Sequence, residues 1–253
     1  MAMKEVPMDE VPLEDEEVKF VKRDDGVRTI YKGLEYLPCN GGYMLCTPEI
    51  HDGVGIIPPE CYDIPREVDG KPVVKIHCVA FSYLTTKALK RVIIPDSVVE
   101  IDESAFASIS GLKNVAFIID PNNPKYKVID GNLYSKDGKT LLAGIGKGDD
   151  NEIFVVPDGI SELGAYALRS YKCTGIIIPS SVKRIGKEAF PLGYNEYFSN
   201  TNIYFKGTKN QMRIPGLGYA RNVYVYKEGK PSLFNKHTWH FAADGVTPEI
   251  TKK

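Results

Sequence analysis

Residues 93–106 read IIPDSVVEIDESAF, and the chain repeats this pattern. Near copies are VVPDGISELGAYAL at 155–168 and IIPSSVKRIGKEAF at 177–190, and a looser copy, DIPREVDGKPVVKIHCVAF, occupies 63–81. Each copy sets Ile or Val before a proline and then spaces its apolar residues in one order, which ends in Ala followed by Phe or Leu. Because one such unit cannot bury its own apolar face, its repetition predicts a stack of coils with a shared core.

A short frame of the form apolar-x-x-apolar-x-apolar precedes the repeated pattern. Successive copies start 23 residues apart from 89 to 112, 22 from 151 to 173 and 20 from 200 to 220, near the 20–29 residues of a leucine-rich repeat. Such alternation is typical of a short strand with one side facing the core, and the proline that follows cannot continue a strand ladder. We therefore predict one continuous parallel sheet made of strands 92–94, 115–117, 154–156, 176–178, 203–205 and 223–225.

The segments IPDSVVEIDESAF and IPSSVKRIGKEAF resemble the BspA-type leucine-rich repeat, which occurs in many bacterial surface proteins and in some protist ones. The resemblance covers about residues 58–226. It implies an α/β fold, namely a horseshoe-shaped leucine-rich-repeat solenoid with short parallel strands on its concave face and a short helical turn at each Ala-Phe pair. It also implies protein or surface recognition rather than chemistry. Asp102 and Leu168 replace the usual Gly and Phe, so we expect less regular coils there.

Two hairpin patterns interrupt or flank the repeats. The insertion at 118–150 contains LYSKDGKTLL, in which Asp-Gly between alternating residues signals a β-hairpin, and residues 28–46 carry Asn40-Gly41-Gly42 at a second turn. A solenoid end needs a cover for its core. The expected organisation is an acidic flexible tail, an N-terminal hairpin cap, the solenoid with its insertion, and a C-terminal cap and tail containing Phe234, Trp239 and Phe241, with bounds 1–27, 28–57, 58–226 and 227–253.

The bulk composition fits a folded protein without a strong electrostatic partner. The chain is 43% hydrophobic, and its 32 Lys and Arg balance 33 Asp and Glu, so the basic field that supports nucleic-acid binding is absent. No apolar run reaches the roughly 20 residues of a membrane-spanning helix. The first residues show no secretory signal pattern, so we expect the cytoplasm if this N-terminus is native, and the cell surface or secretion if a leader has been removed.

Candidate chemistry is weak, and the sequence predicts no cofactor, no metal site and no catalytic residues. The five cysteines lack the spacing of a zinc or redox motif, so we interpret them as reduced structural thiols. His237 and His240 in HTWH could share a metal on a helix, with Asp244 near, but surface histidines around Trp239 fit better. The neighbours His77 and Cys78 lack an evident orienting partner for nucleophilic catalysis.

The strand register names the side chains that point away from the core. One outward column holds Asp63, Ile93, Ala116, Val155, Ile177, Tyr204 and Tyr224, and the other holds Cys61, Arg91, Asn114, Ile153, Gly175, Asn202 and Asn222. The first column is apolar for a face that meets water, and such patches often mark partner sites. The competing explanation is strand propensity, since β-branched and aromatic residues suit strands regardless of function. The binding candidates are Arg91, Ile93, Asn114, Val155, Ile177, Asn202, Tyr204, Asn222 and Tyr224.

Three hypotheses for function remain open on the sequence alone. The first is a non-enzymatic recognition or adhesion module that binds a protein partner through the concave strand face, with Tyr204, Tyr224 and Ile177 as anchors. The second is a carbohydrate-binding surface adhesin in which the tyrosines act as stacking platforms. The third is an enzyme whose site lies in a cap or between coils.

Overall fold

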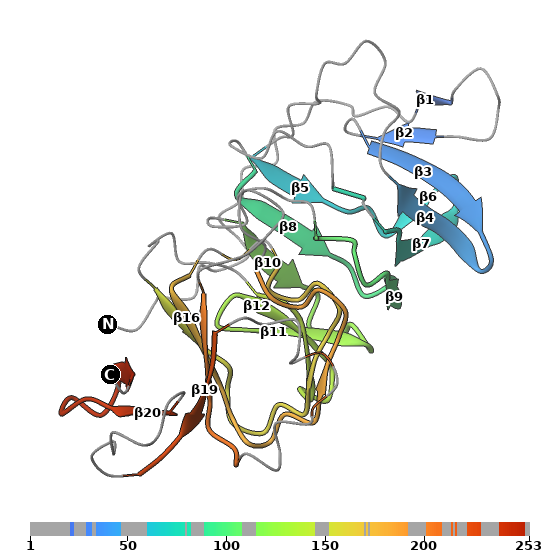
Figure 1. The fold of residues 1–253 in the computed structure, drawn as a ribbon. Coiled ribbons are helices and arrows are strands. Elements are labelled where there is room, and N and C mark those ends of the chain that lie inside the picture. Colours follow the sequence, from blue (N-terminus) through green and yellow to red (C-terminus); the bar gives the residue numbers. More distant parts are fainter. Residues whose placement is uncertain are drawn as a thin grey trace.

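The computed structural model describes residues 21–22, 29–31, 34–46, 60–78, 80–81, 89–107, 115–144, 152–169, 171, 173–191, 201–208, 214, 216, 222–228 and 238–250. Every regular element in these ranges is a β-strand, and the strands stack as successive coils (Figure 1). The leucine-rich-repeat fold is confirmed, but the short helical turns expected at the Ala-Phe pairs are not found in these ranges, so the α part of the expected α/β class is not confirmed. Among the described residues no helix is long and apolar enough to cross a membrane.

One side of the stack carries the strands that precede each proline. A three-stranded parallel sheet has the order β10-β8-β5, and a six-stranded sheet has the order β14-β16-β18-β19-β20-β21. Their bounds are β5 Cys61–Asp63, β8 Arg91–Ile94, β10 Ala116–Ile119, β14 Ile153–Val155, β16 Gly175–Ile178, β18 Asn202–Phe205, β19 Asn222–Tyr226, β20 Thr238–Phe241 and β21 Pro248–Ile250.

The predicted parallel pairing is confirmed for the repeat strands, but one continuous sheet is wrong. Among the described strands, β10 and β14 are not hydrogen-bonded neighbours. The insertion follows β10 directly with two antiparallel pairs, β11–β12 and β12–β13. The parallel ladder stops at β10 because the chain next forms these antiparallel strands and only afterwards returns to the repeat strands at β14.

The other side of the stack carries a second set of strands, which range from two residues in β9 to six in β3 and β7. Its sheets have the orders β1-β2-β3-β4-β7-β6, with β9 on β7, and β11-β12-β13-β15-β17. Their bounds are β1 Val21–Lys22, β2 Thr29–Tyr31, β3 Leu34–Cys39, β4 Gly42–Cys46, β6 Glu67–Val68, β7 Lys71–Ile76, β9 Glu100–Ile101, β11 Tyr126–Ile129, β12 Asn132–Ser135, β13 Thr140–Ala143, β15 Glu162–Leu163 and β17 Arg184–Ile185.

The proline and the Ala-Phe pair of the repeat have the same structural role in successive coils. After β8, β14 and β16 the proline carbonyl accepts a hydrogen bond from the N–H three residues on, at 3.4 Å from Val98 to Pro95, 3.4 Å from Ile160 to Pro157 and 3.2 Å from Val182 to Pro179. These turns direct the side chains of Val98, Ile160 and Val182 into the core. The Ala-Phe pairs then lie buried at the opposite corner, where Phe106 stacks on Phe81 of the preceding coil with ring centroids 5.4 Å apart.

The N-terminal hairpin packs on the first coil. Strands β3 and β4 pair antiparallel, and β4 continues in parallel onto β7. Tyr36 of β3 is buried and its hydroxyl lies 3.1 Å from the hydroxyl of Tyr62, which in turn donates to the carbonyl of Tyr31. Burial raises the pKa of both tyrosine hydroxyls well above the usual value, so they remain protonated donors.

The hairpin β12–β13 lies between two apolar cores. Leu133 and Ala143 belong to the core of the N-terminal coils, whereas Tyr134 and Leu141 belong to the core of the C-terminal coils. Consecutive residues of a strand point to opposite faces, so Leu133 and Tyr134 of β12 enter different cores. In β13, Leu141 belongs to the C-terminal core and Ala143 to the N-terminal one, and the β12–β13 register is irregular between Leu133 and Tyr134.

Glycine at the Ile-Gly position lets neighbouring coils approach closely. A Cβ added to Gly186 would lie 2.3 Å from the backbone nitrogen of Ala165 in the preceding coil. The same addition at Gly164 would meet the carbonyl oxygen of Leu141 at 3.1 Å. The close contact is with backbone at Gly186, so no side-chain rotation can relieve it.

We expect Gly186→Ala to destabilise the fold by about 1–3 kcal/mol, as overpacking does. Gly164→Ala is the matched control at the same repeat position and should have the smaller effect. The urea midpoints of the parent and both variants measure this. Equal midpoints for the two variants would contradict the close approach of the coils at Gly186.

Candidate functional site

The outward columns of the strand face are assembled largely as the repeat pattern predicts. In the six-stranded sheet Val155 pairs with Ile177, Ile177 with Tyr204, and Tyr204 with Tyr224. In the three-stranded sheet Asp63 pairs with Ile93. The side chains predicted to share a column therefore lie side by side on adjacent strands.

Strand β10 is the exception, because its register differs from the prediction by two residues. The expected frame placed Ala116 beside Ile93, but the structure pairs Ala116 with Arg91 and Ile118 with Ile93. A shift of two residues keeps the inward and outward faces, so Phe117 stays in the core. The sequence reasoning missed Ile118, although Phe117-Ile118-Ile119 matches Val92-Ile93-Ile94 more closely than the frame that was chosen.

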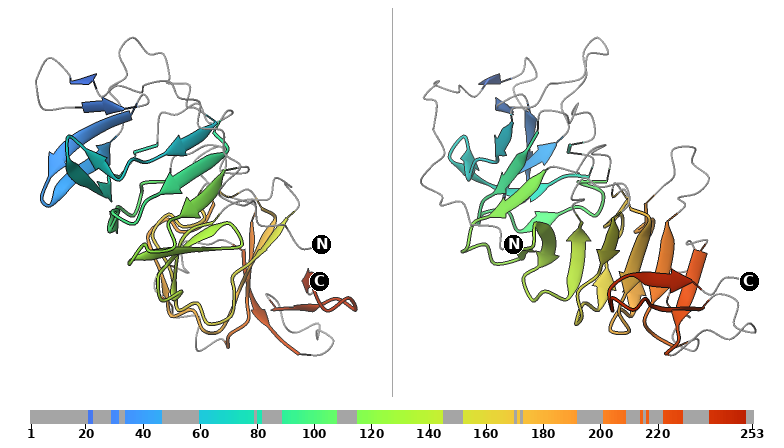
Figure 2. Two further views of the ribbon diagram at one scale, coloured as in Figure 1. Left: turned by 180° about the vertical axis from the view of Figure 1, so that it is seen from behind. Right: turned by 90° about the vertical axis from the view of Figure 1, so that its left-hand side faces the viewer.

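The C-terminal hairpin β20–β21 covers the apolar column at its far end. Figure 2 shows this hairpin crossing the outer face of the strands, and Trp239 of β20 is fully buried there. Ile177 and Tyr204 are 2% and 6% exposed beneath it. The expectation that these two side chains face water is therefore wrong. Strand β20 pairs with β19 at the end of the sheet, and its Trp239 packs over the outward column.

Aromatic rings fill the contact between the hairpin and the sheet. The Trp239 ring centroid lies 5.3 Å from Tyr204 and 5.1 Å from Tyr226, and Phe241 packs on Trp239 at 4.9 Å. The Trp239 indole N–H donates to the carbonyl of Phe205 at 3.2 Å. Burial raises the pKa of Tyr204. Trp239 and Tyr226 were not among the sequence candidates, because their place on the face depends on a contact between distant segments.

The remaining candidates differ in how far solvent reaches them. Val155 is 52% exposed, whereas Arg91, Ile93, Asn202, Asn222 and Tyr224 are partly buried. Tyr224 stacks on Tyr204 with ring centroids 5.9 Å apart, and the Asn202 amide donates to the Tyr204 hydroxyl at 3.3 Å. Asn114 lies outside the described residues. Val155 is thus the exposed apolar member of the column, and the partly buried Ile93 and Ile118 lie with it outside the cluster around Trp239.

Most of the described cysteines and histidines show no arrangement typical of a catalytic or metal site. All five cysteines are free thiols. Burial raises the pKa of Cys46 and of Cys173 to about 12, so these two are inert thiols at neutral pH. His240 lies 3.3 Å from Glu249 across the β20–β21 pair, and Asp244 accepts hydrogen bonds from its own turn. His237, like Phe234, lies outside the described residues.

A pocket lies where β9 and β13 face each other across the break between sheets. Its lining includes the carboxylates of Asp102, Glu103 and Glu162. Two of them are engaged by cations, since Lys75 lies 2.8 Å from Asp102 and Arg184 lies 2.9 Å from Glu162. Both ion pairs connect neighbouring coils, so these two carboxylates are held by cations and not placed as an acid–base pair.

Comparison with known proteins agrees with this architecture. A family model described as the BspA type leucine rich repeat region matches six copies, over residues 70–136 and 150–210. The chain is similar to the structure of a leucine-rich repeat protein from Eubacterium ventriosum, at 16% identity and a TM-score of 0.39, over 68% of this chain and 64% of that one. No curated protein matches it.

Two further solved structures are similar over parts of longer chains. One is a leucine rich cell surface protein from Faecalibacterium prausnitzii, with 24% identity, a TM-score of 0.37, and coverage of 78% of this chain and 42% of that one. The other is a leucine-rich repeat protein from Bacteroides ovatus, with 19% identity, a TM-score of 0.37, and coverage of 77% and 48%. The chain spans less than two thirds of each of these three proteins. The six matched copies, which take up about half of the chain, show that it belongs to the BspA-type leucine-rich repeat family.

Proposed function

We propose that the protein is a non-enzymatic recognition module that binds a protein partner through the uncovered part of its strand face. The family consists of repeat proteins that generally act in protein interaction or adhesion and are generally non-enzymatic. The similar protein from Faecalibacterium prausnitzii is a leucine rich cell surface protein. The candidate face comprises Ile93, Ile118 and Val155 of the apolar column.

The observation that carries this proposal is the docking of the chain's own C-terminal hairpin on the same face. Trp239 is fully buried against Tyr204, and the partly buried rings of Tyr224, Tyr226 and Phe241 complete the contact. The outward column therefore accepts an aromatic-bearing peptide segment, with one hydrogen bond from the indole to a strand carbonyl. Aromatic anchors in well-packed sites dominate protein interfaces in the same way.

The uncovered half of the column has a mixed apolar and charged character. Val155 and Ala116 are exposed, and Ile93 and Ile118 lie side by side across β8 and β10. The charged residues Asp63 and Arg91 flank Ile93 along and across the strands. An apolar centre with a polar surround is typical of a protein interface.

The tyrosines do not favour carbohydrate stacking. A sugar platform needs an open aromatic face, but Tyr204 is occupied by Tyr224 at 5.9 Å and by Trp239 at 5.3 Å. These rings serve the internal contact with the hairpin. The uncovered half of the column is aliphatic at Ile93, Ile118 and Val155.

We expect the double substitution Ile93→Asp and Val155→Asp to weaken binding of a protein partner at least tenfold, or about 1.4 kcal/mol. The partner is first captured on the immobilised chain and identified by mass spectrometry, and its affinity for purified variants is then measured by calorimetry. Ile129→Asp is the matched control, because Ile129 is 41% exposed on the insertion hairpin and off the strand face. A double variant that binds as tightly as the parent would exclude this face.

A further inference from the structure

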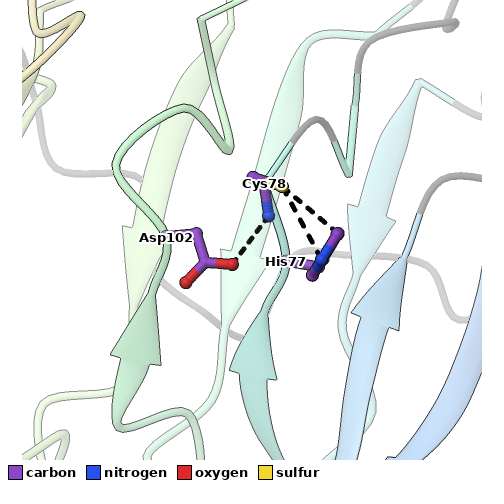
Figure 3. A group of neighbouring side chains, drawn as sticks. All are labelled: His77, Cys78 and Asp102. Carbon is purple, nitrogen blue, oxygen red and sulfur yellow. Dashed lines mark hydrogen bonds between the residues drawn. The ribbon is translucent and has the colours of Figure 1, made fainter.

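Three potential metal ligands meet at the corner of the first coil, away from the strand face. His77 and Cys78 follow β7, and Asp102 follows β9 on the neighbouring coil (Figure 3). An imidazole nitrogen, a thiol sulfur and a carboxylate oxygen all lie within 4.8 Å of one another, and the three residues are partly buried. We propose that His77, Cys78 and Asp102 bind a divalent transition-metal ion of the zinc type, a site that the sequence analysis did not expect.

The donor set selects the class of ion. Thiolate, imidazole and carboxylate are the ligands of zinc, whereas calcium and magnesium take oxygen ligands. The Cys78 sulfur lies 3.6 Å from each ring nitrogen of His77, close to the separation of about 3.5 Å between ligands of a tetrahedral ion with bonds of about 2.0–2.3 Å. Binding releases the Cys78 thiol proton to solvent. Three protein ligands leave a fourth position for water or for a group from a partner.

The backbone that carries the three ligands is fixed by the coil. The N–H of His77 donates to Leu45 at 2.8 Å, and the N–H of Asp102 donates to Ile76 at 2.9 Å. The N–H of Cys78 donates to a carboxylate oxygen of Asp102 at 3.0 Å. The parallel pairing of Ile76 with Ile101 sets the spacing between the two coils. The site is therefore pre-organised and needs side-chain rotation rather than refolding.

Lys75 is the competitor for the Asp102 carboxylate. Its ammonium lies 2.8 Å from Asp102 and 2.6 Å from Glu100, and these carboxylates hold the pKa of Lys75 above its usual value. Because Glu100 remains as a partner, Lys75 can leave Asp102 without losing its counter-charge. A carboxylate also has enough lone pairs to keep the Cys78 N–H bond while it coordinates an ion.

The corresponding corners of the later coils cannot carry such a site. Their residues are Gly164-Ala165 and Gly186-Lys187, where the first two coils have His77-Cys78 and Asp102-Glu103. A side chain on Gly186 would collide with the backbone of the preceding coil. Asp102 instead extends its carboxylate to the preceding coil and accepts from Cys78. Asp102 stands where the repeat usually has glycine, and this replacement places a potential metal ligand between two coils.

The test titrates the full chain with zinc chloride by calorimetry and with cobalt chloride by absorption. We expect one ion per chain and a thiolate-to-cobalt charge-transfer band. Cys78→Ser and His77→Gln should remove the band and weaken zinc binding by more than the roughly 10–100-fold that loss of an outer-shell partner costs. Asp102→Asn keeps an acceptor for the Cys78 N–H and should also weaken binding.

Cys173→Ser is the matched control, because Cys173 is a partly buried thiol in the C-terminal core. It should bind zinc as the parent does. Zinc should also raise the Tm of the parent and of Cys173→Ser but not that of Cys78→Ser, provided that circular dichroism shows all variants folded. A parent chain that binds no zinc at micromolar concentration, or a Cys78→Ser chain that binds it unchanged, would overturn the proposal.

Discussion

Replacing Asn123 by alanine is expected to lower the free energy of unfolding by about 4 kcal/mol, or about 1 kcal/mol for each of four hydrogen bonds. Asn123 is fully buried. Its amide donates to the carbonyls of Pro95 at 2.8 Å and Val98 at 3.0 Å, and its oxygen accepts from the N–H groups of Lys125 and Tyr126, both at 2.9 Å. Alanine would leave these four backbone groups without this partner, two of them in the coil and two at the start of the insertion.

The neighbouring asparagine is a matched control for this prediction. Asn122 is exposed, so Asn122→Ala should change the stability by no more than about 0.5 kcal/mol. Asn123→Asp keeps the acceptor but directs a carboxylate oxygen at the carbonyls of Pro95 and Val98, so it should be as damaging as alanine. Urea denaturation measures all three variants, and a midpoint for Asn123→Ala equal to that of Asn122→Ala would refute the role of Asn123.

Phe106→Ala should destabilise the protein by about 3–5 kcal/mol, as removal of a buried ring does. The Phe106 ring lies between Phe81 and Phe117, with centroid distances of 5.4 and 4.7 Å, so it connects successive coils. Its removal leaves a void that two neighbouring rings border. Phe190 occupies the same repeat position and is similarly buried, and we expect a loss of the same order for Phe190→Ala.

Phe106→Leu is the control variant, because it changes the same residue without leaving the large void that alanine leaves. It keeps much of the apolar volume and should cost less than about 1.5 kcal/mol. Thermal unfolding of Phe106→Ala and Phe106→Leu against the parent gives both differences. Small and equal Tm shifts for the two variants would show that the ring does not support the core.

The repeat pattern predicts much of the fold because it reports burial directly. Val92, Ile94 and Ile176 alternate with outward residues, and the structure buries them as expected. The predicted register of β10 was wrong because Val115, Phe117 and Ile119 all fit the same alternation. The pattern therefore allows two frames that differ by two residues, and the structure has the one that pairs Phe117 with Val92 of β8. The helical turns are not confirmed, because the described corner at Phe106 is closed by single turn hydrogen bonds, such as the one from the N–H of Ala105 to the carbonyl of Asp102, and is too short to form a helix.

The sequence predicts which side chains of the candidate site point outward from the sheet, but it does not predict which of them solvent can reach. Whether Ile93 and Ile177 face outward follows from strand parity, which the sequence contains. Whether Ile177 is accessible depends on Trp239, which lies 62 positions further along the chain and has no repeat partner to predict its place. The ligand cluster at His77 was missed for a similar reason, since Asp102 reaches it from another coil.

The two-faced hairpin β12–β13 also limits how the chain can be divided. In an array of equivalent coils, removal of a terminal unit exposes one interface and leaves the other units intact. Here a cut on either side of the hairpin strips one of its faces, because Leu133 and Ala143 serve one half while Tyr134 and Leu141 serve the other. Both cores therefore depend on the same hairpin. Coils on the two sides of the insertion cannot be separated without exposing apolar residues of one core.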